Sequence, residues 1–379
     1  MRVVIIGGGA VGSSAAYHLA KRPDFNGTIT VIERDPTYRI ASSSLSASSI
    51  RQQFSTPICI AMSQYGWEFL RDVPEAGLKQ RAYLFLATEA GADILRENQA
   101  IQHDNGADIS LLGPAALQKR FPWMNTADIA LGAVGESGEG WFDGPGLLAE
   151  LKRRARGLGV SYVAQVATGF VRSGDRITAV MLADGSAVPS DTVVNAGGPW
   201  AARIASWAGI DLPVRARKRM IYVVGCRQAL PDCPLVIDPS GIFFRPEGAV
   251  FLSGRSPGAG EADPDEPPLE VEDAMFHDQV WPALANRVPA FEALRLQSSW
   301  AGYYEYNIFD QNGIIGPHPT CSNLIFANGF SGHGIQHSPA TGRGVAELIL
   351  DGGFTSLDMR TLGFERVIAN RPLVERNIV

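Results

Sequence analysis

The sequence is poor in the residues that build metal sites and disulfide frameworks. Its 379 residues include six histidines without the spacing of metal ligands and four cysteines without a Cys-x-x-Cys pair, namely Cys59, Cys226, Cys233 and Cys321. These absences exclude a zinc-ribbon or disulfide-rich protein, and we expect no metal ion. Scattered cysteines are typical of a reducing compartment, so the sequence predicts a cytoplasmic protein.

Further absences limit the partners that we expect. No apolar run reaches the roughly 18 residues that a membrane-crossing helix needs. The net charge is −6 and basic residues do not cluster with aromatic ones, which argues against nucleic acid. A strand pattern begins almost at the first residue and leaves no room for a targeting peptide. We therefore expect a small-molecule partner, no membrane span, and a monomer or small oligomer.

Glycine, by contrast, occurs in an informative pattern near the start. An apolar strand pattern at Val3–Ile6 leads into Gly7, Gly9 and Gly12, and Glu33 ends the next strand pattern. Gly7 permits a tight turn, Gly9 lets the backbone approach a pyrophosphate, and Gly12 lets a helix lie close to the strand. Free N–H groups at the helix N-terminus would hold the pyrophosphate, and the acid would bind ribose hydroxyls. The pattern predicts a dinucleotide site.

Later segments favour FAD over NAD. Short strand patterns with turn signals extend over residues 160–196 and end in a glycine turn at Ala196–Trp200. A β-meander inserted into a nucleotide-binding fold suits an FAD domain better than an NAD domain. A second glycine-rich helix start, Gly329–Gln336, precedes a helix pattern at 341–350. We expect the two glycine-rich helix starts to converge on one flavin nucleotide.

Two other segments have unusual composition. Residues 40–49 contain six serines, which is typical of a flexible linker. Their position between Glu33 and a helix pattern at 58–70 favours contact with a cofactor instead. The acidic, proline-rich residues 258–268 indicate a solvated loop, and the pattern after them predicts a helix over 271–286.

The predicted fold class is α/β, with a Rossmann-like FAD-binding domain that carries the inserted β-meander and a mixed-sheet α+β substrate domain. We expect the FAD-binding domain to be discontinuous and to comprise residues 1–77, 141–213 and 321–379. Residues 78–140 and 214–320 would form the substrate domain.

The chain resembles the D-amino-acid oxidase and sarcosine oxidase family of flavoproteins, and the likeness covers nearly its whole length. It is strongest at Val3–Glu33, Ser43–Arg51, Val194–Trp200 and Gly329–Gln336. A closer likeness to one flavoprotein of this kind lies in Ser49–Ser55 (Ser-Ile-Arg-Gln-Gln-Phe-Ser), Trp300–Asn307, Phe309–Gly313 and Gly329–Gly334. The resemblance implies oxidation of a secondary or N-alkyl amino acid, or of a D-amino acid. Hydride would pass from the C–H beside nitrogen to flavin N5, and the imine would then be hydrolysed.

The resemblance also implies roles for single residues. Arg51 falls where sarcosine oxidases place an arginine near the substrate carboxylate, a task suited to a guanidinium fork, although a surface arginine is the alternative. Tyr303 falls near the cysteine that tethers FAD in monomeric sarcosine oxidases, and residues 40–60 contain no histidine for such a bond. The resemblance therefore implies non-covalent FAD.

Other positions depart from the family. Tyr304 stands where glycine oxidase and D-arginine dehydrogenase have an arginine, and Gln336 stands where sarcosine oxidases have a second carboxylate-binding lysine. Leu252 or Ser253 occupies the region of the lysine that activates oxygen in sarcosine oxidases. The missing lysine favours a dehydrogenase, which would pass electrons to a quinone or another carrier.

Two basic residues complete the predicted catalytic set. Arg219 could face the site from a strand, or be an ordinary surface charge. His333, with a usual pKa near 6.5, could accept a proton from the substrate, or be a structural histidine. The predicted catalytic residues are Arg51, Tyr303, Tyr304, Arg219 and His333. The predicted cofactor-binding residues are Gly7, Gly9, Ala10, Val11, Gly12, Glu33, Arg34, Ser43, Ser44, Ser46, Ala47, Ser48, Val166, Gly197, Trp200, Gly332, His333, Gly334, Ile335 and Gln336.

Two other functions stay open on the sequence. One is a flavin-stabilised assembly or interaction protein with little turnover. The other is an NAD-linked dehydrogenase, which would carry no flavin.

Overall fold

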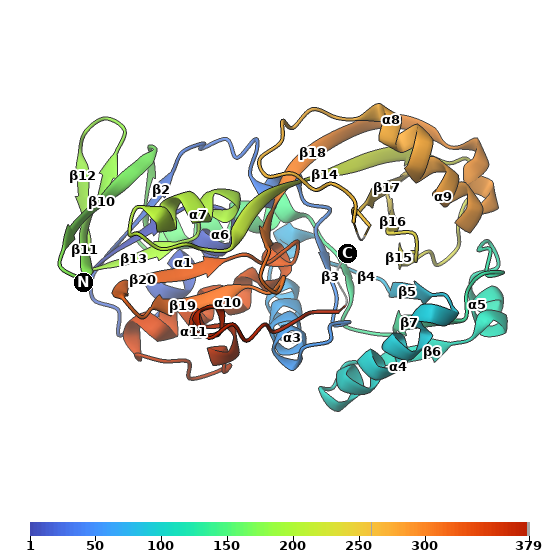
Figure 1. The fold of residues 1–379 in the computed structure, drawn as a ribbon, viewed down its shortest axis with the longest axis horizontal. Helices are drawn as coiled ribbons and strands as arrows, with labels where there is room; N and C mark the ends of the chain where they lie inside the picture. The colour runs from blue at the N-terminus through green and yellow to red at the C-terminus, as the bar shows by residue number, and fades with distance from the viewer. Residues whose placement is uncertain (259, 377–379) are drawn as a thin grey trace.

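Two large β-sheets organise the chain. The computed structural model describes residues 1–258 and 260–376, and Figure 1 shows one sheet on the left and the other on the right. The left sheet has six strands in the order β19 (Ile314–His318), β20 (Cys321–Asn328), β13 (Thr192–Asn195), β1 (Arg2–Ile6), β2 (Thr28–Glu33) and β9 (Ser161–Ala164). All neighbours are parallel except the β19–β20 hairpin.

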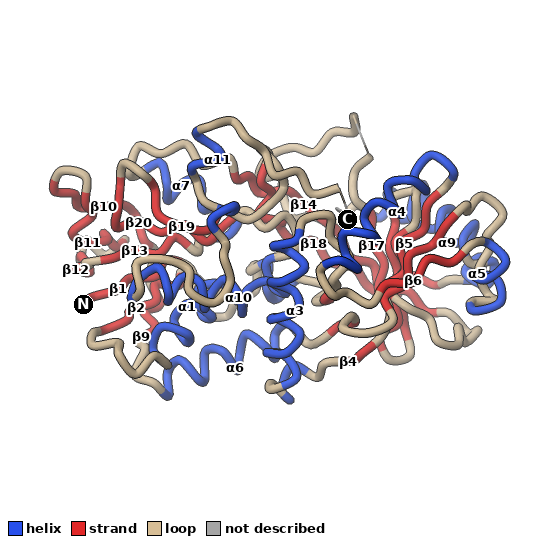
Figure 2. The backbone as a smooth tube through the Cα atoms, turned by 90° about the horizontal axis from the view of Figure 1, so that it is seen from below, coloured by secondary structure: helices blue, strands red, loops and turns tan. Residues whose placement is uncertain are grey.

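The left sheet is covered on both faces, as its apolar strands require. Val3 and Ile5 of β1 face a core that includes α1 (Ala10–Ala20), α6 (Gly144–Gly157) and α10 (Gly334–Leu350). Val4 and Ile6 alternate with them and face α7 (Ala201–Ser206) and part of a three-stranded sheet. That sheet comprises β10 (Ala167–Ser173), β11 (Arg176–Leu182) and β12 (Ala187–Pro189) and is the expected β-meander. Figure 2 shows α1, α6 and α10 on the side of the strands opposite to α7.

The right sheet is mixed and has eight strands. Their order is β18 (Arg295–Asn307), β14 (Val214–Gly225), β17 (Val250–Arg255), β16 (Ile242–Glu247), β15 (Leu235–Ile237), β5 (Tyr83–Ala87), β7 (Leu131–Gly135) and β6 (Ile109–Leu112). The helices of this half are α4 (Glu89–Asp104), α5 (Pro114–Arg120), α8 (Asp273–Met275) and α9 (Trp281–Arg287). The α/β fold with an inserted meander and a mixed second sheet is thus confirmed.

Short elements join the two halves. A small sheet contains β3 (Ser49–Ile50), β8 (Gly140–Trp141) and β4 (Lys79–Gln80), and the helices around it are α2 (Ser42–Leu45) and α3 (Pro57–Arg71). Helix α11 (Glu365–Ile368) and 3-10 turns at Pro74–Ala76, Gly198–Trp200, Pro289–Ala293 and Arg360–Leu362 complete the fold. We propose that the two domains follow the two large sheets, with the last boundary before β19, because β19 pairs with β20.

Two predicted helix boundaries were wrong. Helix α10 begins at Gly334 instead of Thr341 and includes Pro339. The Ser338 hydroxyl donates to the Ile335 carbonyl at 2.9 Å, which is the acceptor that the missing proline N–H would have used. The helix expected over 271–286 is divided into α8, a π-helical turn at Phe276–Val280 and α9. Pro282 near the start of α9 lacks the N–H that would close a regular turn with residue 278.

The two helices that begin at glycine-rich turns lie against each other. A Cβ on Gly342 of α10 would be 2.2 Å from the Ser14 hydroxyl of α1, so only glycine allows this close crossing. The N-termini of both helices consequently reach the same side of the left sheet, where the site described below lies.

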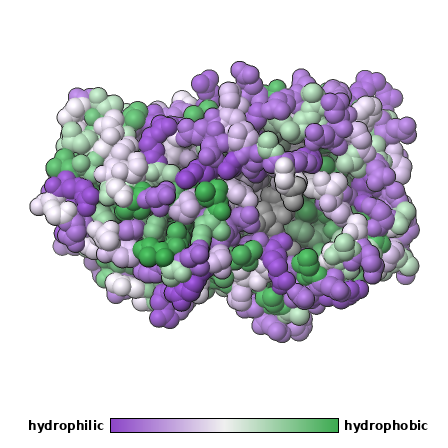
Figure 3. All heavy atoms as spheres, in the orientation of Figure 1, coloured by the Kyte–Doolittle hydropathy of each residue, from purple (hydrophilic) through white to green (hydrophobic). Residues whose placement is uncertain are grey.

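The face in Figure 3 is mostly hydrophilic over α8 and α9, and its apolar groups elsewhere are interrupted by hydrophilic side chains. Within the described residues no helix combines the length and apolar character needed to cross a bilayer.

Candidate functional site

Two adjoining cavities lie between the sheets. The first, here the Gly7 cavity, is bounded by the glycine motif, the end of β2 and the turn before α7. The second, here the Arg51 cavity, extends from α2 to β14–β16 and the start of α10. They share the lining residues Ala10, Val11, Ser42, Ser43 and Glu305. The two cavities therefore form one continuous space that an elongated ligand can fill.

The glycine motif shapes the floor of the Gly7 cavity. Gly7 has a φ of +100°, and a Cβ there would lie 2.2 Å from the Ala196 carbonyl oxygen. A Cβ on Gly12 would lie 1.9 Å from the Gly7 carbonyl oxygen. Both positions thus require glycine. The start of α1 lines the cavity through Gly9, Ala10 and Val11, and the Ala10 N–H donates to the Ser43 hydroxyl at 2.9 Å. A helix N-terminus at a cavity wall suits an anion.

The far end of the Gly7 cavity combines an acid with an aromatic ring. Glu33 accepts the Gly8 N–H at 2.8 Å and the Asp35 N–H at 2.9 Å, one on each carboxylate oxygen. Each oxygen keeps a second lone pair for a ligand hydroxyl. The Arg34 guanidinium lies 3.4 Å from the centre of the Trp200 ring, and both residues line the cavity.

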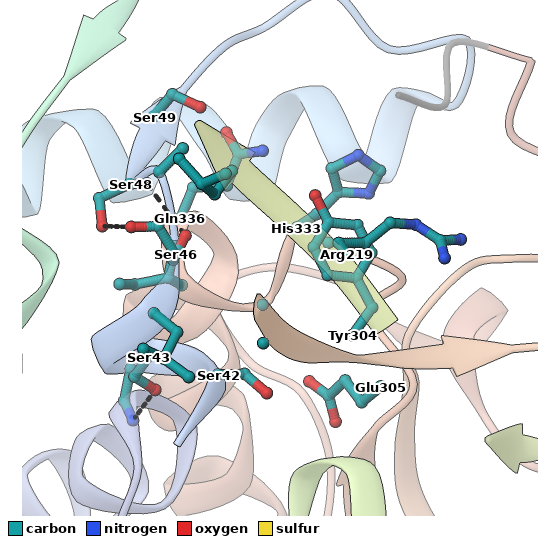
Figure 4. Close-up of a pocket in the computed structure, with 18 of the residues that line it drawn as sticks. Ser42, Ser43, Ser46, Ser48, Ser49, Arg219, Tyr304, Glu305, His333 and Gln336 are labelled. Carbon is teal, nitrogen blue, oxygen red and sulfur yellow. Dashed lines mark hydrogen bonds between the residues drawn. The ribbon is translucent and has the colours of Figure 1, made fainter. Parts of the chain in front are cut away.

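The Arg51 cavity is built around the start of α10, as Figure 4 shows. A Cβ on Gly332 would lie 2.7 Å from the Tyr304 ring, so the turn before the helix and the tyrosine are in close contact. Gln336, in the first turn, accepts the Arg51 backbone N–H at 2.9 Å. The opposite wall is apolar and comes from β14, β15 and β16; it consists of Ile221, Leu235, Ile237 and Phe243.

Arg51 is almost fully enclosed, with 2% of its surface exposed. Its guanidinium donates to the Gln53 carbonyl and, at 3.0 Å, to Nε2 of His333. It also lies 4.0 Å from the Phe54 ring centre. These contacts fix a buried positive charge at the edge of the cavity, so the alternative of a surface arginine is wrong.

His333 lies between this arginine and the α10 N-terminus. Burial, together with the Arg51 charge, lowers the pKa of His333 well below its usual value. The ring is therefore neutral, and its Nε2 accepts from the guanidinium. This environment disfavours the role of proton acceptor that the sequence suggested for His333.

Arg219 lines the cavity but has a partner of its own. Its guanidinium makes a bidentate ion pair with Asp263, with N–O distances of 2.8 and 2.9 Å. Asp263 belongs to residues 261–267, here called the strap, which also places the Pro267 carbonyl 2.6 Å from the Tyr303 hydroxyl. The strap is a largely exposed loop, as the sequence predicts, and its acids additionally pair with arginines of the right sheet.

Nearly all the predicted site residues line one of the two cavities. The exceptions are Gly12, which serves the packing of α1 on β1, and Ser44. The serine-rich segment lines both cavities through α2, which a flexible linker would not do. Within the described part of the chain, no group of three or more His, Cys, Asp or Glu side chains could hold a metal.

Sequence reasoning missed Glu305 and the apolar wall. Glu305 stood inside a quoted family segment, but its strand pattern does not reveal that it faces a cavity. Burial raises its pKa to about 8, partly offset by hydrogen bonds from backbone N–H groups of Gly329 and Phe330. A carboxyl with a perturbed pKa in a cavity is a signal of a functional site.

Comparison with known proteins agrees with this geometry. A family model described as FAD dependent oxidoreductase matches residues 2–348. The chain belongs to this family. The chain is similar to FAD-dependent oxidoreductase domain-containing protein 1 from Xenopus laevis. The two are 44% identical over 100% of this chain and 84% of that protein. Glycine oxidase from Geobacillus kaustophilus is 27% identical over 92% of each chain.

Solved structures give the same result. L-proline dehydrogenase from P. horikoshii superposes with a TM-score of 0.88 at 25% identity, over 98% of each chain. The resemblance and the FAD cofactor expected from the sequence are thus confirmed, and the NAD-linked alternative is wrong.

The residues present fit FAD. The first turn of α1 offers N–H groups for a pyrophosphate, and Glu33 offers acceptors for ribose hydroxyls. The lining of the joined cavities reaches from this end to the start of α10, where helix N–H groups would suit the oxygen-bearing edge of a flavin ring. FAD, when bound, supplies a two-electron acceptor that no side chain offers.

Proposed function

We propose that this FAD-dependent oxidoreductase oxidises an amine that carries a carboxylate, namely a secondary or N-alkyl amino acid or a D-amino acid. The observation that carries the proposal is the buried Arg51, which lines the cavity at the start of α10 together with an apolar wall. The names of its relatives support the same class, since they include a sarcosine dehydrogenase, a glycine oxidase and an L-proline dehydrogenase.

The cationic residues of the cavity would have different roles toward the substrate. Arg51 would bind the substrate carboxylate, because its charge is enclosed and neutral His333 adds no competing charge. Arg219 is the weaker candidate for binding the carboxylate, since its guanidinium already forms a bidentate ion pair with Asp263. Enclosure in the cavity and the positive charge of Arg51 would lower the pKa of a bound ammonium, so they favour the neutral amine from which hydride leaves. The apolar wall excludes water while the substrate is held.

An anaerobic reduction screen tests the function. We expect the purified protein to be yellow and at least one N-methyl, cyclic or D-amino acid to bleach its flavin absorbance. Denaturation should release the flavin, because we propose that FAD is bound without a covalent bond. Matched amines that lack the carboxylate serve as controls and should reduce the flavin at least about tenfold less efficiently, since they lose a charge-assisted contact of about 1.5 kcal/mol or more. A complete panel without any reduction would contradict the proposal and favour a protein with little turnover.

We further propose that the enzyme is a dehydrogenase. None of the described residues that line either cavity is a lysine, and neither Leu252 nor Ser253 lines them. A positive group beside the ring would stabilise the superoxide that forms first when oxygen takes electrons. We expect the anaerobically reduced enzyme to be reoxidised by oxygen about 100-fold more slowly than a true oxidase. Stopped-flow mixing with air-saturated buffer measures this rate, and mixing with a soluble quinone provides the comparison. Reoxidation by oxygen at the speed of a true oxidase would show that the lysine argument is wrong.

The free state of the cysteines bears on the cellular compartment in which the protein acts. All four are free, and three of them, Cys59, Cys233 and Cys321, are buried. Because a reducing environment keeps such thiols unpaired, we propose the cytoplasm as the site of action. No observation favours the alternative of an assembly protein.

A further inference from the structure

Glu305 occupies a special position in the joined cavities. It is the one ionisable side chain among the described residues that line both. FAD must extend from the N-terminus of α1 to the N-terminus of α10, so the segment between its pyrophosphate and its ring passes between the shared residues. In Figure 4 the carboxyl group of Glu305 points toward Ser42 from the other side of this passage.

The side chain is held in place by the loop that precedes α10. One carboxyl oxygen of Glu305, Oε2, accepts the Gly329 N–H at 3.1 Å, and its backbone carbonyl accepts the Ser331 N–H at 3.1 Å. The other oxygen, Oε1, lies 2.9 Å from the position that a Cβ on Gly334 would take. Glu305 is thus fixed between the loop and the helix N-terminus, and it is not a surface carboxylate that happens to border a hollow.

The charged neighbours do not neutralise it. The titratable groups on β18, β14 and α10 around Glu305 are Tyr303, Tyr304, Tyr306, Arg215, Arg217, Arg219 and His333. The three arginines pair with Asp263 and Asp265 of the strap, and the Tyr303 hydroxyl donates to the strap backbone. Burial keeps His333 neutral and raises the pKa of Tyr304. Within the described residues no ion pair reaches Glu305, and burial raises its pKa to about 8.

We propose that Glu305 binds FAD as the neutral acid and donates its carboxyl O–H to the segment between the pyrophosphate and the flavin ring. That segment offers hydroxyl and phosphate oxygens as acceptors. A carboxylate at this point would repel the negative pyrophosphate, whereas the acid both avoids the repulsion and supplies a donor. The bound cofactor therefore keeps the proton on Glu305 at a pH where the empty site has lost it. This inference rests on the family's cofactor and is independent of the proposed amine chemistry.

The sign of the pH dependence follows from linkage. The pKa of Glu305 is higher in the complex than in the empty site, so the full FAD affinity is present below pH 8 and is lost as the pH rises above it. In the experiment, the holoenzyme is diluted at pH 6.5 and at pH 9.5, and released FAD is measured by its fluorescence. We expect the dissociation constant for FAD to be at least about tenfold higher at pH 9.5.

Two variants distinguish a neutral hydrogen-bond donor at position 305 from a charged carboxylate. Glu305→Gln keeps a donor without titration, so it should bind FAD as tightly as the natural protein at pH 6.5 and lose the difference between the two pH values. Glu305→Ala removes the donor and should bind at least about tenfold more weakly at both. The proposal is overturned if Glu305→Gln releases FAD as readily as Glu305→Ala, since a carboxylate acceptor would then be required. It is also overturned if the natural protein and Glu305→Gln show the same pH dependence, a comparison that holds even if Glu305→Ala does not fold.

Discussion

Replacing Gly12 with alanine is expected to leave the protein without FAD and to lower the free energy of unfolding by about 3 kcal/mol. The added Cβ would lie 1.9 Å from the Gly7 carbonyl oxygen and 3.2 Å from the Ala196 side chain. The first contact is with backbone, which cannot rotate away, so α1 must move off β1. Overpacking of this kind costs about 1–3 kcal/mol or more, and the helix N-terminus no longer points at the pyrophosphate. Flavin absorbance of the purified protein and its denaturant unfolding curve measure the two effects.

Two other glycines provide matched controls. Gly9→Ala places its Cβ 3.2 Å from the Ser43 hydroxyl, a contact that a side-chain rotation relieves. Because Gly9 lines the cavity, this variant should keep the unfolding free energy of the flavin-free protein but bind FAD weakly. Gly157 lies at the end of α6, and a Cβ there meets no atom within 4 Å. Gly157→Ala should therefore lower neither FAD binding nor the free energy of unfolding. Gly12→Ala protein that stays yellow and as stable as Gly157→Ala would contradict the role given to the motif.

Replacing Arg51 with lysine is expected to raise the dissociation constant of the substrate about 100-fold while leaving the flavin content unchanged. Lysine keeps the charge but loses the planar fork that matches a carboxylate. It also loses the simultaneous contacts to the Gln53 carbonyl, His333 and the Phe54 ring that orient the guanidinium. A factor of 100 corresponds to about 2.7 kcal/mol, within the range for a buried charged contact. Anaerobic rapid-mixing reduction at several substrate concentrations separates the dissociation constant from the limiting rate.

Arg219→Lys is the control for this variant, because it alters a second cation of the same cavity. Asp263 already holds the Arg219 guanidinium at 2.8 and 2.9 Å, so we expect substrate binding to change no more than about threefold. If Arg219→Lys weakened binding more than Arg51→Lys, the carboxylate anchor would be Arg219, with Asp263 displaced by the substrate.

The parts of the site that could be predicted from the sequence are those whose chemistry is contiguous in the chain. The strand, the three glycines and Glu33 lie within the first 33 residues, and each meets its partner through one βαβ unit. The positive φ of Gly7 and the 1.9 Å approach of a Gly12 Cβ to the Gly7 carbonyl oxygen arise within that unit, whereas the contact of Gly7 with Ala196 does not. The second glycine-rich turn was also recognisable, although its helix begins at Gly334 and not at the predicted residue 341.

The rest depends on contacts between distant segments, which a single sequence does not encode in any local pattern. Glu305 gains its place because β18 ends beside the loop before α10. The partner of Arg219 lies on the strap, 44 residues away, in a stretch whose acidic composition alone indicates solvent. The neutral state of His333 likewise follows from Arg51, which is 282 residues distant.

The crossing of α1 and α10 also determines when the protein can acquire its cofactor. The glycine motif is translated more than 300 residues before Gly342, the residue of α10 that meets Ser14. β20, which pairs with β13 in the same sheet, also comes late in the chain. We therefore expect FAD to bind only after α10 has been translated, and chains that terminate before α10 to be colourless and sensitive to proteases.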